Sequence, residues 1–310
     1  MHRFRSWQLF AICVLVWGTT WHVITWQLGD FPPELGVAIR FALAGAALLL
    51  FCLWRGVRLA FAGRDHALLA LQGTFLYGVS YVCVYQAERF VPSGLVAVGY
   101  SASPLLTGVG ATLLFGAPLG TRFLLGGTLG IAGVALIFWP EIARPGSAER
   151  AALGAVLTAA SVLLSTVGSL AASRNRHRGL PLLPAMGFGM LYGALAAVLV
   201  AVAFGRGADW PTAPSWWLAL AYLSLAGSVL AFACFLTLQD RVGAGRAGTV
   251  GVMTPLIALV VSLAVEGFRP SLLTFAGAAL AVAGNVLMLR PASSAPGRPP
   301  AAAAAAAAAE

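Results

Sequence analysis

The sequence contains no lysine, and only 9% of its 310 residues are charged. Without lysine the chain can form neither a Walker-type phosphate loop nor a Schiff base, so ATP does not drive this protein directly. A soluble domain needs roughly a quarter of its residues charged to cover its surface. With 60% hydrophobic residues and a mean hydropathy of +0.88, this chain is instead suited to lipid.

Histidine and cysteine are also scarce. His22 is the only histidine inside a predicted span, which is too little for a metal site or for an intramembrane protease with a histidine base. The four cysteines lack CxxC spacing and are interpreted as free packing thiols: Cys13, Cys52, Cys83 and Cys234. We therefore expect no catalytic residue, metal or cofactor, and an intramembrane enzyme is kept only as an alternative of a different class.

Long apolar runs dominate what is present. About 20 helical residues cross a hydrocarbon core, and ten stretches of that length can be drawn. They cover residues 7–28, 35–54, 67–87, 92–115, 121–139, 151–172, 182–204, 215–238, 244–266 and 272–290. The predicted fold class is an all-α integral membrane protein of ten transmembrane helices. Residues 291–310, rich in Pro, Ser and Ala, are expected to form a disordered tail.

The chain is an internal duplication, because the segment around Ser103-Pro104 recurs around Thr254-Pro255. At a constant offset of 151 residues, eight positions coincide: Pro104, Leu105, Gly116, Gly126, Leu129, Gly133, Leu136 and Pro140 match Pro255, Leu256, Gly267, Gly277, Leu280, Gly284, Leu287 and Pro291. Two repeats of five helices follow, over 7–139 and 151–290. An odd number of spans per repeat predicts inverted repeats about an axis in the membrane plane.

Arginine supplies all of the basic charge, and its distribution predicts orientation. With the N-terminus in the cytoplasm, thirteen arginines lie in inner segments: Arg3, Arg5, Arg55, Arg58, Arg64, Arg122, Arg174, Arg176, Arg178, Arg241, Arg246, Arg290 and Arg298. Five lie in outer segments: Arg89, Arg144, Arg150, Arg206 and Arg269. This bias predicts cytoplasmic termini and explains the net charge of +9 without a nucleic-acid partner.

Several segments resemble the drug/metabolite transporter superfamily, and specifically its ten-helix EamA-type members. They are Trp17-Gly18-Thr19-Thr20-Trp21, Arg40-Phe41-Ala42-Leu43-Ala44, and Gln86-Ala87-Glu88-Arg89 followed by Pro92. The resemblance covers about residues 7 to 290. Members often carry a Leu-Gly-Glu signature after the fourth and ninth spans. Here Glu266-Gly267 keeps it, whereas Phe115-Gly116 does not.

Within the superfamily the chain looks most like the YddG-like branch of amino-acid exporters. The resemblance implies a carrier in the bacterial inner membrane that exports small metabolites, amino acids including aromatic ones, by alternating access. Its partners would be a small-molecule substrate and membrane lipid. Export of another metabolite or of a drug-like compound is the alternative within transport, and the oligomeric state is open.

Aromatic residues inside the spans are the first candidates for substrate binding. Tyr77, Tyr81 and Tyr85 form a stripe along one face of the third span. Phenol hydroxyls avoid hydrocarbon, so the stripe points to protein or to a wet cavity, with ordinary helix packing as the alternative. Tyr100 in the fourth span is a further candidate.

A tryptophan pair in the first span is the second candidate. Trp17 and Trp21 lie away from the span edges, where Trp7 and Trp26 suit an interfacial belt better. The pair would offer an aromatic wall or a cation–π face to a substrate, unless it faces lipid.

Polar residues and prolines complete the candidates. Ser161 and Ser165, with Thr158, recur at helical spacing, where close helix packing is favoured over substrate contact. Arg40 lies inside the second span, and we favour a structural or gating role for it over receipt of a substrate carboxylate. Pro104 and Pro255 occupy equivalent mid-span positions and are predicted hinges. Glu88 and Glu266 are expected to be solvated at span ends.

Overall fold

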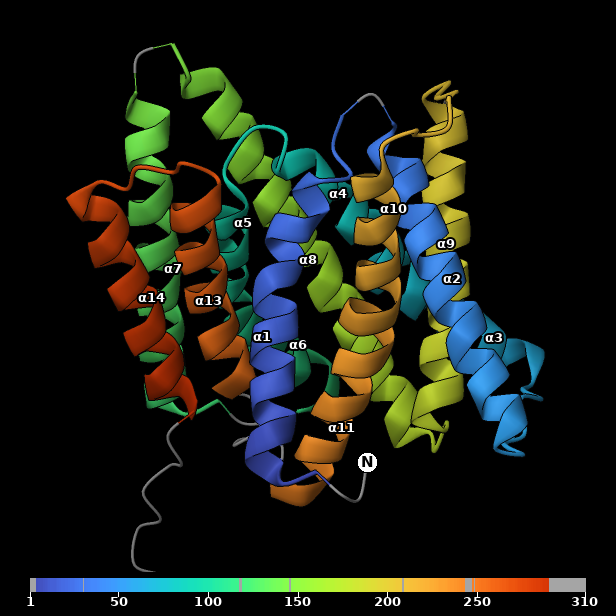
Figure 1. Cartoon of the computed structure of the whole chain (residues 1–310). Coiled ribbons are helices and arrows are strands. Elements are labelled where there is room, and N and C mark those ends of the chain that lie inside the picture. Colours follow the sequence, from blue (N-terminus) through green and yellow to red (C-terminus); the bar gives the residue numbers. More distant parts are fainter. Residues whose placement is uncertain are drawn as a thin grey trace, which may run out of the picture.

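A computed structural model describes residues 4–29, 31–116, 119–144, 146–207, 209–242, 247 and 249–289. Within these residues all regular secondary structure is helical (Figure 1). The tail predicted for residues 291–310 lies outside the described residues.

The first half of the chain supplies five membrane spans. The first span is α1 (Ser6–Thr25), the second is α2 (Pro33–Trp54) and the fifth is α7 (Thr121–Ala143). The third span consists of α3 (Gly63–Gly73), η1 (Thr74–Val79) and α4 (Ser80–Ala87). The fourth consists of α5 (Ser93–Gly99), η2 (Tyr100–Ala102) and α6 (Ser103–Phe115). Pro33 begins α2, where a missing backbone donor costs nothing.

The second half supplies the other five. The sixth and seventh spans are α8 (Ala148–His177) and α9 (Leu182–Ala203). The eighth span consists of α10 (Pro214–Ala221), η3 (Tyr222–Leu230) and α11 (Ala231–Val242). The ninth and tenth are α13 (Thr249–Val265) and α14 (Leu272–Leu289). Eight of the spans have 20 or more residues, and the last two are shorter apolar helices. The ten-span, all-α prediction is confirmed.

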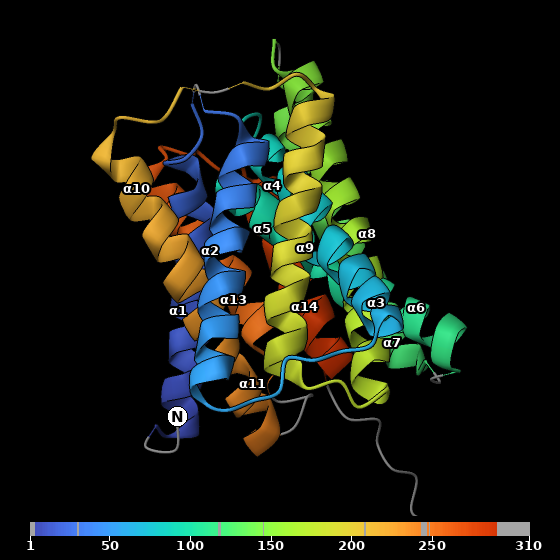
Figure 2. The ribbon, with the colours of Figure 1, turned by 90° about the vertical axis from the view of Figure 1, so that its right-hand side faces the viewer.

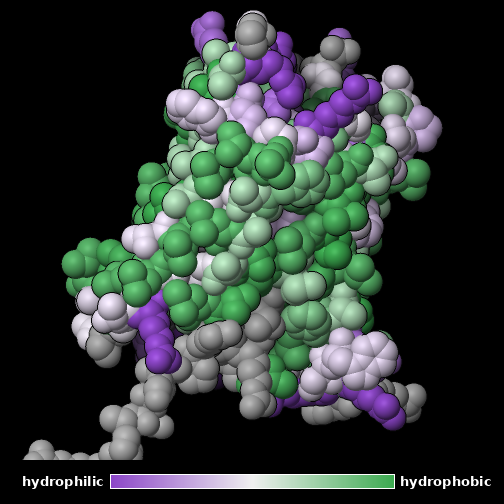
Figure 3. Space-filling view, turned by 90° about the vertical axis from the view of Figure 1, so that its left-hand side faces the viewer, coloured by the Kyte–Doolittle hydropathy of each residue, from purple (hydrophilic) through white to green (hydrophobic). Residues whose placement is uncertain are grey.

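The helices run roughly parallel to one another in one bundle (Figures 1 and 2). We call the end where α1 begins the N-terminal end and the end where α1 stops the opposite end. Apolar side chains form a broad band between more polar ends (Figure 3). Leu113, Leu199 and Leu272 are 80%, 60% and 86% exposed, as expected of side chains that face lipid.

Close glycine contacts join α7 to α14. A β-carbon on Gly126 would clash with the carbonyl oxygen of Gly284, and one on Gly133 would clash with that of Gly277. Small residues are what allow two transmembrane backbones to approach so closely. The glycines of α7 and α14 therefore serve close packing of the two helices.

Irregular helical turns occur at matching places in the two halves. The third span contains the π-helical segment η1, and the eighth contains η3, whose range corresponds to residues 71–79 at the repeat offset. Gly116 and Gly267, also one offset apart, both adopt positive φ, at 68° and 64°. A residue without a β-carbon ends a helix in this conformation at little cost.

Candidate functional site

A cavity of about 780 Å³ lies among the first, third, fourth, fifth, eighth and ninth spans. Six residues singled out from the sequence are on its wall: Trp17, Trp21, Tyr81, Tyr100, Pro104 and Pro255. Its size is within the range of small-molecule sites. We call it the central cavity.

The wall of the central cavity is aromatic and neutral. Phe123 and Phe232 add two more rings, and hydroxyl groups come from Thr20, Ser103, Thr107 and Thr254. Among the described lining residues there is no Asp, Glu, Lys, Arg or His. A ligand with a net charge would lose its hydration here without gaining a counter-ion, which is costly.

Neighbouring groups hold the two tryptophan rings in place. The indole nitrogen of Trp17 donates a hydrogen bond to the carbonyl oxygen of Gly227, at 3.0 Å, and its ring packs edge-on against Phe232. Gly227 belongs to η3, whose altered turns change which carbonyl groups are free to accept such bonds. The Trp21 ring packs against Tyr100, with 5.2 Å between ring centroids.

The tyrosine stripe of the third span has three different environments. Tyr81 is on the wall of the central cavity, whereas the buried Tyr77 lines a second cavity. Tyr85 is fully buried and outside both linings, and its hydroxyl donates to Gln27 Oε1 at 2.9 Å. The structure thus brings one member of the stripe to the central cavity.

Arg40 lies behind the cavity wall. Its guanidinium carbon is 4.9 Å from the centre of the Tyr81 ring and 5.0 Å from that of Phe41. Its nitrogen atoms contact the hydroxyls of Ser228 and Tyr85 at 3.4 and 3.5 Å. Among the described residues it forms no ion pair, so aromatic faces and hydroxyls surround this buried cation.

The two serines of the sixth span are placed differently from the aromatic candidates. Ser161 and Ser165 are buried and donate to carbonyl oxygens of their own helix, those of Thr158 and Val162. Neither serine lines the central cavity or the second cavity. Their placement agrees with the packing alternative for small hydroxyl residues in transmembrane helices.

The second cavity, of about 900 Å³, extends to the N-terminal end of the bundle. It shares Thr107 and Phe232 with the central cavity, and its lining reaches Arg176 and His177 at the end of α8. Polar groups from Gln72 and Arg176 give it a wetter wall than the central cavity. The two cavities adjoin at these shared residues and together extend from mid-bundle toward that end.

Glu266 is largely buried, which corrects the expectation that it is solvated. Its side chain is 14% exposed and accepts hydrogen bonds from His22 Nδ1 at 2.9 Å, Ser262 Oγ at 2.7 Å and the Ser93 backbone nitrogen at 3.0 Å. The Ser93 hydroxyl also donates to it. Burial raises the pKa of Glu266, but the hydrogen bonds from Ser93, His22 and Ser262 outweigh it and lower the pKa overall.

Glu88, which follows α4 at the same end, is also buried rather than solvated. Only 8% of the residue is exposed, and neither carboxyl oxygen has a hydrogen-bond partner among the described residues. Burial and the nearby Glu266 raise the pKa of Glu88 well above its usual range, against the opposing effect of Arg40. Both corrections have one cause: several spans converge at this end and exclude water.

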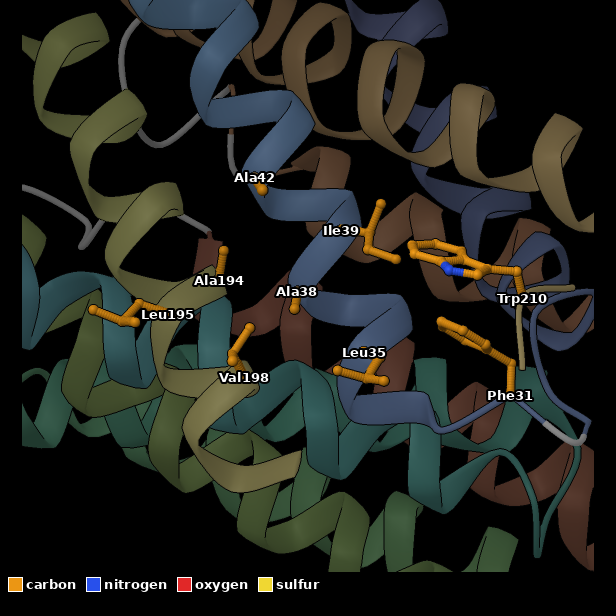
Figure 4. A pocket seen from close by; sticks show the side chains of 9 residues that line it. All are labelled: Phe31, Leu35, Ala38, Ile39, Ala42, Ala194, Leu195, Val198 and Trp210. Carbon is orange, nitrogen blue, oxygen red and sulfur yellow. The ribbon is translucent and has the colours of Figure 1, made fainter. Parts of the chain in front are cut away.

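An apolar groove of about 450 Å³ lies on the perimeter between α2 and α9 (Figure 4). Phe31 and Trp210 lie at one end of it, and short aliphatic side chains such as Ala38 and Ala194 form its floor. No charged residue lines it among those described. Such a surface suits contact with lipid and offers no group that would orient a metabolite.

The EamA-like transporter family model matches the chain twice, over residues 5–139 and 152–290. The inner membrane transporter YedA of Escherichia coli (strain K12), described as uncharacterized, is 30% identical over 267 residues, covering 84% of this chain and 82% of the relative. An aromatic amino acid exporter, YddG of Ancylobacter novellus, is 27% identical, covering 86% of this chain and 91% of the relative.

A crystal structure of another protein has the same fold, with a TM-score of 0.65 and 22% identity over 91% of this chain and 95% of that one. Together, the two family matches, the apolar spans and the cavity between the halves agree with the superfamily resemblance drawn from sequence. The chain is a multi-pass membrane protein that belongs to the EamA-like transporter family of drug/metabolite transporters.

Proposed function

We propose that the protein is a secondary transporter that exports a small, partly apolar metabolite across the inner membrane, and that its substrates are amino acids, including aromatic ones. The observation that carries this proposal is the central cavity, with its aromatic, uncharged wall. The name of one relative, an aromatic amino acid exporter at 27% identity, agrees with it. Tryptophan and tyrosine rings stack on apolar side chains and attract ammonium groups.

Alternating access requires two halves that can rock around a site, and the contacts of α7 and α14 support inverted repeats. Gly126 meets Gly284, and Gly133 meets Gly277. At the repeat offset, Gly284 is the counterpart of Gly133, and Gly277 is the counterpart of Gly126. Gly126 therefore contacts the counterpart of Gly133, and Gly133 contacts the counterpart of Gly126. Such reciprocal pairing between antiparallel helices is what a two-fold axis in the membrane plane produces.

The lack of charge on the cavity wall also favours a second candidate. The ammonium and carboxylate of an amino acid both need partners, and the described lining residues offer only hydroxyls, an indole nitrogen, backbone groups and ring faces. A neutral aromatic compound such as a nucleobase has lower desolvation costs. In either case we expect substrates without net charge.

A counterflow assay in proteoliposomes tests the proposal. Vesicles loaded with unlabelled phenylalanine, leucine, lysine, glutamate or adenine would be assayed for uptake of the same compound in radiolabelled form. We expect exchange of phenylalanine and leucine to exceed that of lysine and glutamate on the order of tenfold, equivalent to about 1.4 kcal/mol. Adenine exchange alone would select the second candidate, and exchange of no compound above protein-free vesicles would contradict both.

A further inference from the structure

The two cavities adjoin each other and extend toward the N-terminal end of the bundle, whereas buried side chains lie at the opposite end. Thr107 and Phe232 connect the central cavity to the second cavity, which reaches Arg176 at the N-terminal end. At the opposite end, Gln27, Tyr85 and Glu88 are each no more than 8% exposed. The described loops of that end contribute no residue to either lining. In the part of the chain that the structure describes, neither of these two cavities extends to the end where α1 stops, which we call the closed end.

The hydrogen bonds of Glu266 join the two halves of the chain at this closed end. Glu266 follows α13 in the second repeat, whereas His22 lies on α1 and Ser93 begins α5 in the first. One carboxylate thus receives donors from two helices of the other repeat, while Ser262 of its own helix holds it in position. Charge-assisted bonds of this kind are roughly twice as strong as neutral ones.

The N-terminal end lacks the corresponding group. At the repeat offset, the counterpart of Glu266 is Phe115, which is 40% exposed. Its ring packs against that of His177, with 5.7 Å between the ring centroids. A phenyl ring cannot accept the three or four hydrogen bonds that a carboxylate accepts. Phe115 therefore provides no polar closure at this repeat position, and the described polar contacts between the repeats at the N-terminal end instead include those of Arg178 with Asp65 and of Asn175 with Gln72.

We propose that Glu266 is a gating residue: its hydrogen bonds to His22 and Ser93 hold the opposite end of the central cavity shut, and the transporter opens at that end by breaking them. This inference rests on the alternating-access part of the proposed function. It does not depend on which metabolite is carried or on which side of the membrane each end faces.

The charge state of the cluster is compatible with closure at neutral pH. The titratable groups that face Glu266 are His22 on α1 and Glu88 after α4, and Arg40 on α2 faces Glu88 in turn. Because closure lowers the pKa of Glu266, the ionised form favours the closed state. The stabilisation of the closed state by ionised Glu266 is complete above the ordinary carboxyl pKa, and it is lost as pH falls through the lowered pKa of Glu266.

The test measures the width of the closed end. Spin labels at positions 89 and 269, both exposed there, report the separation between the loop that leads to Ser93 and the loop that follows Glu266. They would be attached to a variant whose four native cysteines are replaced by alanine and which still elutes as a monodisperse peak. Distance distributions would then be recorded by pulsed electron resonance for the parent, Glu266→Gln, Ser93→Ala and Glu149→Gln.

We expect the parent to show a mainly short distance. Glu266→Gln should raise the long-distance fraction several-fold, and Ser93→Ala, which removes one donor and keeps the carboxylate, should give an intermediate rise. Glu149→Gln makes the same chemical change at an exposed site of the same end and should leave the distribution unchanged. If Glu266→Gln does not fold, the distance distribution of Ser93→Ala alone tests the gate. Unchanged distances in every folded variant would overturn the gate, whereas failed counterflow with shifted distances would overturn only the proposed substrate.

Discussion

Individual side chains on the cavity wall are interlocked rather than independent. Tyr81 contacts the central cavity on one side and the guanidinium of Arg40 on the other, and it packs edge-on against Phe41. Replacing its ring therefore removes both a surface for substrate and the cover over a buried cation. A ring without a hydroxyl group would retain most of these contacts, so Tyr81→Phe separates packing from hydrogen bonding.

We predict that Tyr81→Ala weakens apparent substrate affinity several-fold, because each aromatic contact contributes on the order of 1 kcal/mol. Tyr81→Phe should have a smaller effect. The measurement is concentration-dependent transport, with Trp7→Ala as control because Trp7 is 64% exposed and away from the cavity. Equal affinity in Tyr81→Ala and the parent would mean that the ring serves packing alone.

At the residue scale, part of the aromatic set lines the central cavity, its role in substrate binding stays a prediction, and the expectation for the acids was wrong. Trp17, Trp21 and Tyr81 are on the wall of the central cavity, and the sequence signal for them was an aromatic ring placed away from the edge of a span. Glu88 and Glu266 were predicted to be solvated from their positions at span ends. Whether a span end is wet depends on which other helices converge there, and α1, α5 and α13 do so from distant parts of the sequence.

At the scale of helices, the cavity coincides with breaks in regular helical geometry. Pro104 follows the short segment η2, Pro255 is inside α13, and both are on the central cavity wall. Proline removes a backbone donor and bends a helix, which gives carriers both exposed polar backbone and hinges. The π-helical segments were not predicted, because their sequences carry no proline or other strong signal for a changed turn.

We predict that Pro104→Ala and Pro255→Ala each lower the rate of transport more than they lower the yield of folded protein. A straightened helix would still pack, but it would bend less readily between states. Rates in proteoliposomes would be compared with yields from size-exclusion chromatography. Pro140→Ala is the matched control, since Pro140 is inside α7 and not on the cavity wall. Parallel losses of rate and yield would identify the prolines as packing residues.

At the scale of the whole molecule, the distribution of arginine between the two ends predicts the orientation of the protein in the membrane. Arg64 and Arg178 lie at the N-terminal end, where Arg178 pairs with Asp65 at 3.2 Å, and Glu149 begins the sixth span at the opposite end. The excess of arginine at the N-terminal end is the pattern of a cytoplasmic face.

We predict that cysteines introduced beside Arg64 and Arg178 are shielded from an impermeant thiol reagent in intact cells, whereas one beside Glu149 is labelled. Permeabilised cells provide the control, in which all three positions should react. Labelling beside Arg178 from outside intact cells would contradict both the cytoplasmic termini and the inverted arrangement of the repeats.

The sequence by itself determined the spans, the duplication and the aromatic candidates, because each depends on local composition or on a fixed offset. Hydrophobic length alone decides whether a segment crosses the membrane, so the predicted spans fall within a few residues of most observed helices. Tertiary structure alone decided that Tyr81 reaches the cavity while Tyr85 is buried with Gln27. It also decided that Glu266 meets His22, since the 244 residues that separate them leave no local pattern, and only packing of the two repeats brings these groups within 2.9 Å.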